Sequence, residues 1–171
     1  MATPGDPDDV DRIIAQWRRE RPELDLDAMA TFGRLGRLFA HLGRAVDETF
    51  TRFGLQRGEY DVLAALRRSG APHVLTPSAL SDVLMLSRAG MTNRLDRLET
   101  AGLVERRANR EDRRSMLIAL TDRGVALVDE VTTVHVANES ALLADLTPDE
   151  RHHLDAVARK LLTRFEGTRP R

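Results

Sequence analysis

The chain has 171 residues, a formal net charge of −1 and no cysteine. Its hydrophobic content of 42% is enough for a packed core, and its charged content of 31% is typical of a soluble protein. The lack of cysteine excludes disulfides, thiolate metal sites and catalytic thiols. No apolar run approaches membrane-spanning length, and the acidic N-terminus is unlike a signal peptide, so we expect a cytoplasmic protein with no membrane partner.

Apolar residues recur at helical spacing in three segments before residue 70, namely 8–21, 27–53 and 56–68. The first segment follows acidic residues that favour a helix N-terminus, and it ends before Pro22. Its expected apolar stripe consists of Val10, Ile13, Ile14 and Trp17. In the third segment, the residues expected to face inward are Tyr60, Leu63 and Leu66.

Two short helices are predicted next, with a very short connection between them. The first begins at the N-cap Thr76 and Pro77, and Ser87 is positioned to cap the second. Gly102 follows the second helix, where a left-handed residue often ends a helix. The residues predicted to be buried are Leu80, Val83 and Leu84 in the first helix and Met91, Leu95 and Leu98 in the second.

A basic hairpin follows these two helices. Strands are predicted over 103–107 and 115–120, with the polar loop ANREDRR between them. In the second strand, Met116, Ile118 and Leu120 alternate with smaller or opposite-face residues. Residues 88–114 contain eight arginines and five acids, so this segment is net +3 in a chain that is net −1. Helix, turn, helix and basic hairpin in this order predict a winged helix-turn-helix that binds duplex DNA, with the second helix in the major groove and the hairpin in the minor groove.

The residues DRRSMLIALTDRG, after a helix that ends in AGLVERR, resemble the wing and following helix of MarR family transcriptional regulators. The resemblance extends from about Asp27 to Phe165. It implies that Arg113 enters the minor groove and that Asp112 orients it. The DNA-binding residues expected from the two helices and from this resemblance are Ser87, Arg88, Thr92, Asn93, Arg97, Asp112, Arg113 and Arg114.

The resemblance also implies a fold and an assembly. We expect a mainly α protein with a small β-hairpin wing and no cofactor. The predicted parts are an N-terminal arm helix (1–26), a helical dimerisation region (27–54 and 122–171) and the winged helix-turn-helix domain (55–121). Apolar stripes on the long helices are too extensive for one small domain to cover, which favours a homodimer on a palindromic operator.

The arm QWRRERPELD resembles the urate-responsive, HucR- and PecS-like subgroup of this family. That subgroup pairs an arm tryptophan with an aspartate and two arginines, and the matching residues here are Trp17, Asp61, Arg68 and Arg94. An aromatic face with forked cationic donors suits a flat anionic purine. We therefore predict a repressor that a small anionic ligand such as urate releases from DNA, through contact with Arg94.

Other interpretations stay open at this point. Each of the four residues has an ordinary structural role available: Trp17 as a core residue, Asp61 as an exposed acid, Arg68 as a partner of the helix dipole and Arg94 as a phosphate contact. The ligand is alternatively a phenolic or other aromatic compound, or the protein binds DNA without a ligand. No metal-binding motif surrounds His41, His73 or His135, and no catalytic motif is present, so neither a zinc sensor nor an enzyme is favoured.

Overall fold

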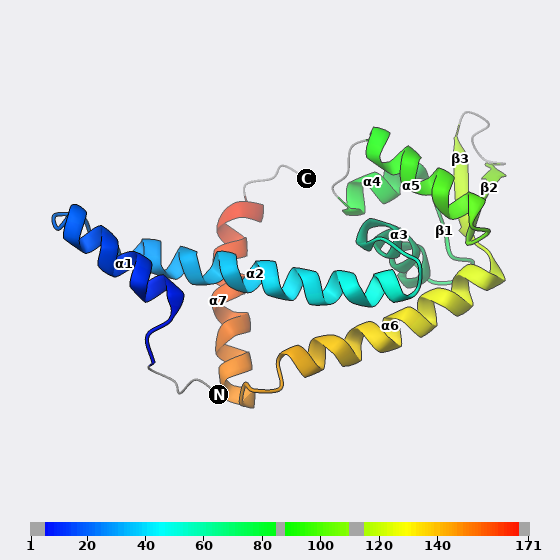
Figure 1. Cartoon of the computed structure of the whole chain (residues 1–171). Helices are drawn as coiled ribbons and strands as arrows, with labels where there is room; N and C mark the ends of the chain where they lie inside the picture. Colours follow the sequence, from blue (N-terminus) through cyan, green and yellow to red (C-terminus); the bar gives the residue numbers. More distant parts are fainter. Residues whose placement is uncertain (1–5, 85–87, 110–114, 168–171) are drawn as a thin grey trace. The chain divides into compact units, whose positions relative to one another are not determined.

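A computed structural model describes residues 6–84, 88–109 and 115–167 of the chain. These residues form seven helices and three strands, in the order α1, α2, α3, β1, α4, α5, β2, β3, α6 and α7 (Figure 1). The fold class predicted from the sequence, mainly α with a small β wing, is confirmed. The chain divides into two compact units, Met1–Ala45 and Val46–Arg171.

The first unit is formed by α1 (Asp9–Glu20) and the first part of α2 (Asp27–Arg52). Asp8 and Asp11 form a capping box that satisfies N–H groups at the start of α1. The guanidinium of Arg34 on α2 donates to both carboxylates, at 2.8 Å to Asp8 and 2.6 Å to Asp11. These ion pairs join the start of α1 to α2.

Only part of the apolar stripe predicted for α1 is buried. Val10 and Ile14 form a small core with Leu26, whereas Ile13 and Trp17 are about half exposed. The reason is that, among the described residues of this unit, α1 is covered by α2 alone, so the buried face is narrower than the stripe.

The second unit has its core around α3 (Arg57–Arg68), which packs against α4 (Pro77–Leu84), α5 (Arg88–Thr100) and α6 (Asp122–Leu142) (Figure 1). This central position explains why both sides of α3 are apolar. Its buried side chains include the predicted Tyr60, Leu63 and Leu66, and also Val62 and Ala65. Burying each large aliphatic side chain contributes about 1.5–3 kcal/mol.

The predicted helix boundaries of the winged helix agree with the structure. The N–H of Ala79 donates to Thr76 Oγ1 at the start of α4, and Pro77 is the first helical residue. Gly102 has a φ of 67° directly after α5, which a residue with a side chain adopts only under strain. Thr121 Oγ1 accepts from the Gly124 N–H and so caps α6.

The wing belongs to a three-stranded antiparallel sheet in the order β1-β3-β2, formed by β1 (Val74–Leu75), β2 (Val104–Ala108) and β3 (Met116–Leu120). The sequence predicted two strands. It did not predict β1, since two residues are too short for a periodic pattern. In the register, Ala119 of β3 pairs with Glu105 on one side and with Val74 on the other.

Two burial predictions for this region are corrected. Val83 is 53% exposed, because only the Leu80 side of α4 faces the core. The expected alternation in β3 also fails: Met116 is exposed, whereas Ile118, Ala119 and Leu120 are all buried. The central strand of a covered sheet is buried on both faces, which removes the alternation.

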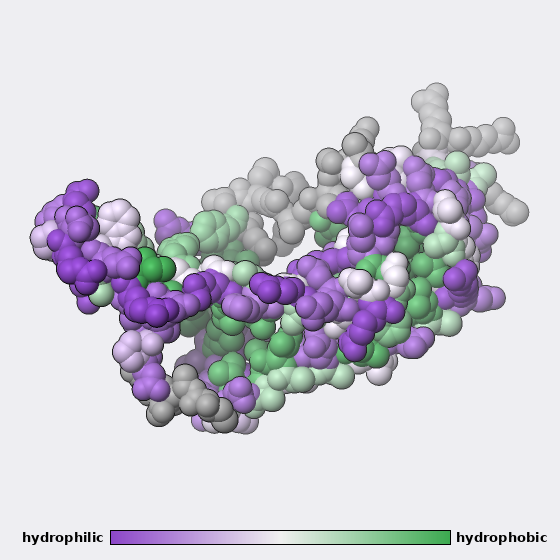
Figure 2. Space-filling view, viewed as in Figure 1, coloured by the Kyte–Doolittle hydropathy of each residue, from purple (hydrophilic) through white to green (hydrophobic). Residues whose placement is uncertain are grey.

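Beyond the wing, α6 is followed by α7 (Pro148–Glu166), which begins with a capping box formed by Thr147 and Glu150. Every described side chain of α7 is exposed. Hydrophobic residues also reach the surface of α6, at Val136 and Leu142, and Figure 2 shows hydrophobic surface along that helix. No helix among the described residues is long and apolar enough to cross a bilayer.

Candidate DNA-binding and ligand-binding sites

The recognition helix of the predicted winged helix is α5. Met91, Leu95 and Leu98 bury one face of it against the core, as the sequence predicted. Thr92 and Asn93 are exposed on the other side, where Figure 2 shows a mostly hydrophilic surface over α5. The helix therefore presents polar groups outward from a fixed apolar base.

Several predicted DNA contacts cannot be placed. Ser87, Asp112, Arg113 and Arg114 lie outside the described residues. Arg88 is the first residue of α5, but its side chain also lies outside the description.

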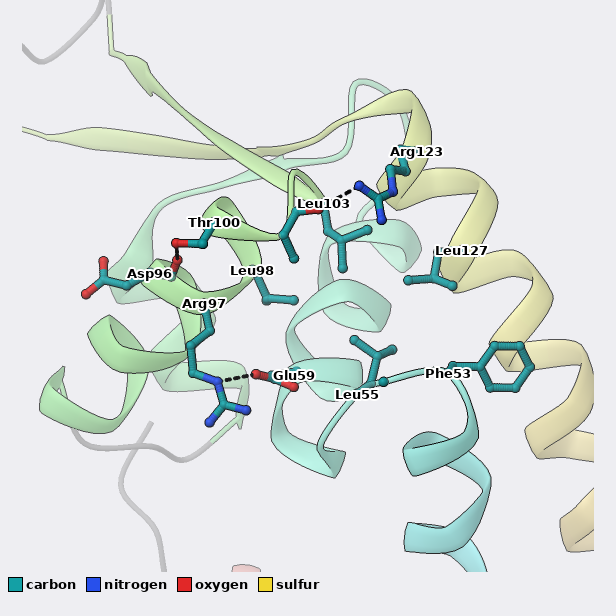
Figure 3. Close-up of a pocket in the computed structure, with 12 residues that line it drawn as sticks. Phe53, Leu55, Glu59, Asp96, Arg97, Leu98, Thr100, Leu103, Arg123 and Leu127 are labelled. Carbon is teal, nitrogen blue, oxygen red and sulfur yellow. Dashed lines mark hydrogen bonds and ion pairs between the residues drawn. The ribbon is translucent and has the colours of Figure 1, made fainter.

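Arg97, also a predicted DNA contact, forms an ion pair with another residue of the same chain. Its Nε lies 2.8 Å from Oε1 of Glu59 on the first turn of α3 (Figure 3). Glu59 is only 5% exposed, although it is a carboxylate. Buried charges are tolerated in proteins when they are paired, and Arg97 supplies the partner.

The wing is joined to α5 by a second set of ion pairs. Arg106 on β2 pairs with Asp96, at 2.5 Å, and with Glu99, both on α5. The hydrogen bond to Asp96 raises the pKa of Arg106 above its ordinary value. This arginine couples the position of the wing strand to that of the recognition helix.

Three of the four predicted ligand-binding residues are brought together in the second unit. Asp61 and Arg68 lie on α3 and Arg94 lies on α5. Burial raises the pKa of Asp61 above its ordinary value, and it outweighs the nearby positive charges that lower it. Those basic groups are Arg57, Arg68, Arg94 and His135. The fourth predicted residue, Trp17, is 43% exposed on α1 of the first unit.

Arg94 crosses α3 at Gly58, one turn before Asp61. A Cβ at Gly58 would overlap the guanidinium of Arg94, with Nη2 at 2.8 Å and Cζ at 2.9 Å. The other end of the guanidinium donates to the Gly90 carbonyl at 3.2 Å. The missing side chain of Gly58 is therefore what lets Arg94 lie against α3, and nothing in the sequence pattern singled this glycine out.

His135 on α6 was also missed, since no motif surrounds it. Its ring lies 4.9 Å from the Phe50 ring and 5.3 Å from the Tyr60 ring, measured between centroids. Nε2 contacts Glu139 at 3.2 Å, whereas the buried Nδ1 has no hydrogen-bond partner among the described residues. His135 thus places a polar atom in an aromatic cluster close to Asp61.

A cavity of about 520 Å³ lies on a different side of α3 (Figure 3). Asp61, Arg68 and Arg94 do not line it. Its wall combines leucines with the Glu59–Arg97 pair, and Arg123 closes one end by donating to the Ala101 carbonyl at 3.0 Å. The lining residues are Phe53, Gly54, Leu55, Glu59, Asp96, Arg97, Leu98, Thr100, Ala101, Leu103, Arg123 and Leu127.

No three histidine, aspartate or glutamate side chains are placed to share a metal ion within 6–84, 88–109 and 115–167. His152 and His153, which are adjacent on α7, have ring centroids 6.4 Å apart.

Comparison with known proteins identifies the family. Residues 53–115 match the MarR family. The HTH-type transcriptional regulator PecS of Dickeya dadantii is 43% identical over 149 residues, which cover 87% of this chain and 90% of PecS. The chain belongs to the MarR family. It is therefore a winged helix-turn-helix transcriptional regulator and not an enzyme, and its similarity to PecS agrees with the predicted subgroup.

Further relatives agree with this assignment. The HTH-type transcriptional regulator PapX of Escherichia coli is 33% identical, over 91% of this chain and 94% of PapX. Among solved structures, a mutant of MarR from Escherichia coli complexed with operator DNA has a TM-score of 0.69 at 28% identity. The match covers 80% of this chain and 97% of that MarR chain.

Proposed function

We propose that this MarR family protein is a homodimeric repressor that binds a palindromic operator and leaves it when a small anionic ligand, such as urate or a related purine, binds. The observation that carries the ligand part is the cluster of Asp61, Arg68 and Arg94. It joins α3 to the recognition helix, so a ligand bound there contacts the element that reads DNA.

The DNA part of the proposal rests on the outer face of α5 and on the wing. Thr92 and Asn93 are exposed on that face, with Arg88 at its start, and these residue types bind phosphates and base edges. The wing contributes the segment Asp112–Arg114. The winged helix-turn-helix domain is 55–121 in this proposal, and the MarR structure bound to operator DNA supports the same use of the fold.

The dimer part rests on exposed apolar side chains in the proposed dimerisation region, 27–54 and 122–171. On α7, the exposed hydrophobic residues are Leu154, Val157, Leu161, Leu162 and Phe165. On α2 they are Met29, Phe32, Leu38 and Phe39. A second copy that covers both stripes would remove these side chains from water, and its two recognition helices would read two half-sites about one DNA turn apart.

In the ligand site we propose, Arg68 and Arg94 bind the delocalised negative charge of the ligand. Trp17, on the arm helix (1–26), is the fourth residue that we assign to ligand binding, because its ring offers an aromatic face that suits a flat purine. Asp61 responds to the bound anion, since its carboxylate already interacts electrostatically with the same two arginines. Ligand binding would draw Arg94, and the recognition helix with it, toward α3. The affinity for DNA falls because the ligand favours a position of α5 that does not fit the groove.

The test is a footprinting titration of the purified protein on the DNA upstream of its own gene. We expect one protected palindromic site, which urate releases and xanthine and salicylate release less well. Release by salicylate alone supports a phenolic ligand instead. A site that none of the three compounds releases argues against this ligand class, and protection without sequence preference argues against a repressor.

A further inference from the structure

The Glu59–Arg97 ion pair joins the first turn of α3 to the recognition helix at a residue that the sequence had assigned to DNA. Both oxygens of Glu59 are in use. Oε1 pairs with Arg97 Nε at 2.8 Å (Figure 3). Oε2 accepts the backbone N–H of Gln56 at 2.7 Å, which caps α3.

The burial of the two partners differs strongly. The Glu59 side chain is 6% exposed, whereas that of Arg97 is 56% exposed. Glu59 is a fixed point at the start of α3, where the helix dipole also favours a negative charge. Arg97 therefore extends from α5 to a carboxylate that is buried at the start of α3.

Arg97 does not act alone on this side of α5. Arg94, one turn earlier, lies against Gly58, the residue next to Glu59. On the other side of the helix, Asp96 and Glu99 hold Arg106 of β2. Charged contacts on two sides thus restrain rotation of α5 about its own axis, which apolar packing of Met91, Leu95 and Leu98 alone does not define.

We infer that Arg97 is a positioning residue of the recognition helix and not a DNA contact. Its ion pair with Glu59 holds α5 in the orientation that presents Thr92 and Asn93 to the groove. This inference rests on the DNA-binding function proposed above, but it assigns Arg97 a different role. It also makes Glu59, which lies away from the DNA-binding face, necessary for full affinity.

The two roles differ in their dependence on salt. Each phosphate contact adds about one unit to the slope of log affinity against log salt concentration, because it releases counterions from DNA. A positioning residue changes affinity without changing the number of phosphates contacted. The slope therefore separates Arg97 as a tether from Arg97 as a phosphate ligand.

The experiment compares Glu59→Gln, Arg97→Gln and the double variant with the wild type, by fluorescence anisotropy on the operator at several salt concentrations. We expect each single variant to weaken binding about tenfold, as is typical of residues coupled by direct contact, and the double variant to bind no worse than the weaker single one. All four proteins should have the same salt slope. Arg159→Gln is the matched control, because it removes an exposed arginine that pairs with Asp155 on α7.

A slope that falls by about one unit in Arg97→Gln, or wild-type affinity in Glu59→Gln, overturns the inference. Amide hydrogen exchange without DNA gives a second readout. Both variants should increase exchange in α5 relative to α6, and unchanged exchange in α5 overturns the inference even if no operator is found. Failure of the wild type to bind any specific site, with increased α5 exchange in the variants, counts against the proposed function alone.

Discussion

Arg94 lies across Gly58, so that one glycine of α3 determines where the guanidinium of a recognition-helix residue can rest. Residues three apart on a helix share a face, and Gly58 is three residues before Asp61. The Arg94 guanidinium thus comes close to Asp61 because Gly58, which it crosses, has no side chain. The contact links the proposed ligand site to the helix that reads DNA.

Gly58→Ala should uncouple these two sites. The new methyl group displaces the flexible Arg94 side chain, so we expect DNA binding within about threefold of wild type, a small change in Tm and a loss of most of the urate response. Titration of the operator complex with urate measures this. Arg94→Ala should show the same loss, and a full response in Gly58→Ala would contradict the proposed route through Arg94.

In the proposed ligand site, Arg68→Ala should remove a charge that binds the ligand and does not touch DNA. We expect an unchanged Kd for the operator and a urate concentration for half-release at least about tenfold higher, in line with the loss of one charge-assisted hydrogen bond. Trp17→Phe should have a smaller effect in the same direction, since the ring face is kept and the indole donor is lost. Arg67→Ala is the control, because Arg67 is also at the end of α3 but pairs with Asp129 at 2.8 Å. A normal urate response in both Arg68→Ala and Trp17→Phe would place the ligand elsewhere.

Arg113→Ala tests the loop of the wing, residues 110–114, which lies outside the described residues. A minor-groove arginine is attracted by the negative potential of a narrow groove, so its removal should weaken operator binding and lower the salt slope by about one unit. Electrophoretic mobility shifts at matched salt concentrations give both values. If affinity and slope both stay at the wild-type values, the wing does not enter the groove.

The raised pKa of Asp61 predicts a pH dependence of stability. Because burial raises the pKa of Asp61 in the folded state, the folded protein binds this proton more tightly than the unfolded chain does. The stability that Asp61 contributes is therefore present below its ordinary pKa and is lost as pH rises through the raised value. Asp61→Asn removes this loss, so its Tm relative to wild type should be higher at about pH 7 than at about pH 4.

Glu150→Gln provides a contrast of opposite sign. Hydrogen bonds from the backbone and side chain of Thr147 lower the pKa of Glu150, so its contribution is present at neutral pH and is lost on acidification. The Tm of this variant relative to wild type should be lower at about pH 7 than at about pH 4. If the Tm of both variants relative to wild type changed with pH in the same direction, burial of Asp61 would not control its ionisation.

Leu161→Glu tests the dimer. Leu161 is 48% exposed on α7, so a charge there is tolerated in a monomer. In the proposed dimer the same charge would be buried without a partner, which is strongly unfavourable, and we expect a shift to monomer in analytical ultracentrifugation together with weaker operator binding. Arg164→Glu, on the same helix and also exposed, should change the assembly less. Unchanged sedimentation of Leu161→Glu would show that this part of α7 is not covered.

Strong local signals explain why much of the fold was predictable. The N-cap Thr76 and the left-handed Gly102 are decided by a few neighbouring residues, and both predictions agree with the structure. The strand Val74–Leu75 was not predictable, because it pairs with β3, more than forty residues later in the sequence. Val83 was mispredicted for a similar reason, since the spacing of apolar residues does not show how wide a face the core covers.

The candidate sites divide in the same way. Residue types and their spacing were enough to indicate a DNA-binding winged helix and a charged cluster that includes Asp61 and Arg68, which share a face of one helix. The sequence also assigned Arg97 to DNA, since an arginine on the outer half of a recognition helix is ordinarily a phosphate contact. The buried position of Glu59 supports a different assignment.

By itself, the sequence determined the family, the order of the elements and the places where most of the helices begin and end, because these depend on residues that are near one another in the chain. Only the tertiary structure decided what α5 touches: Arg94 over Gly58, Arg97 on Glu59, and Arg106 on Asp96 and Glu99. The first two of those contacts depend on the missing side chain of Gly58 and on the burial of the Glu59 carboxylate. Neither property exists until α3 and α5 pack together, so no local pattern records them.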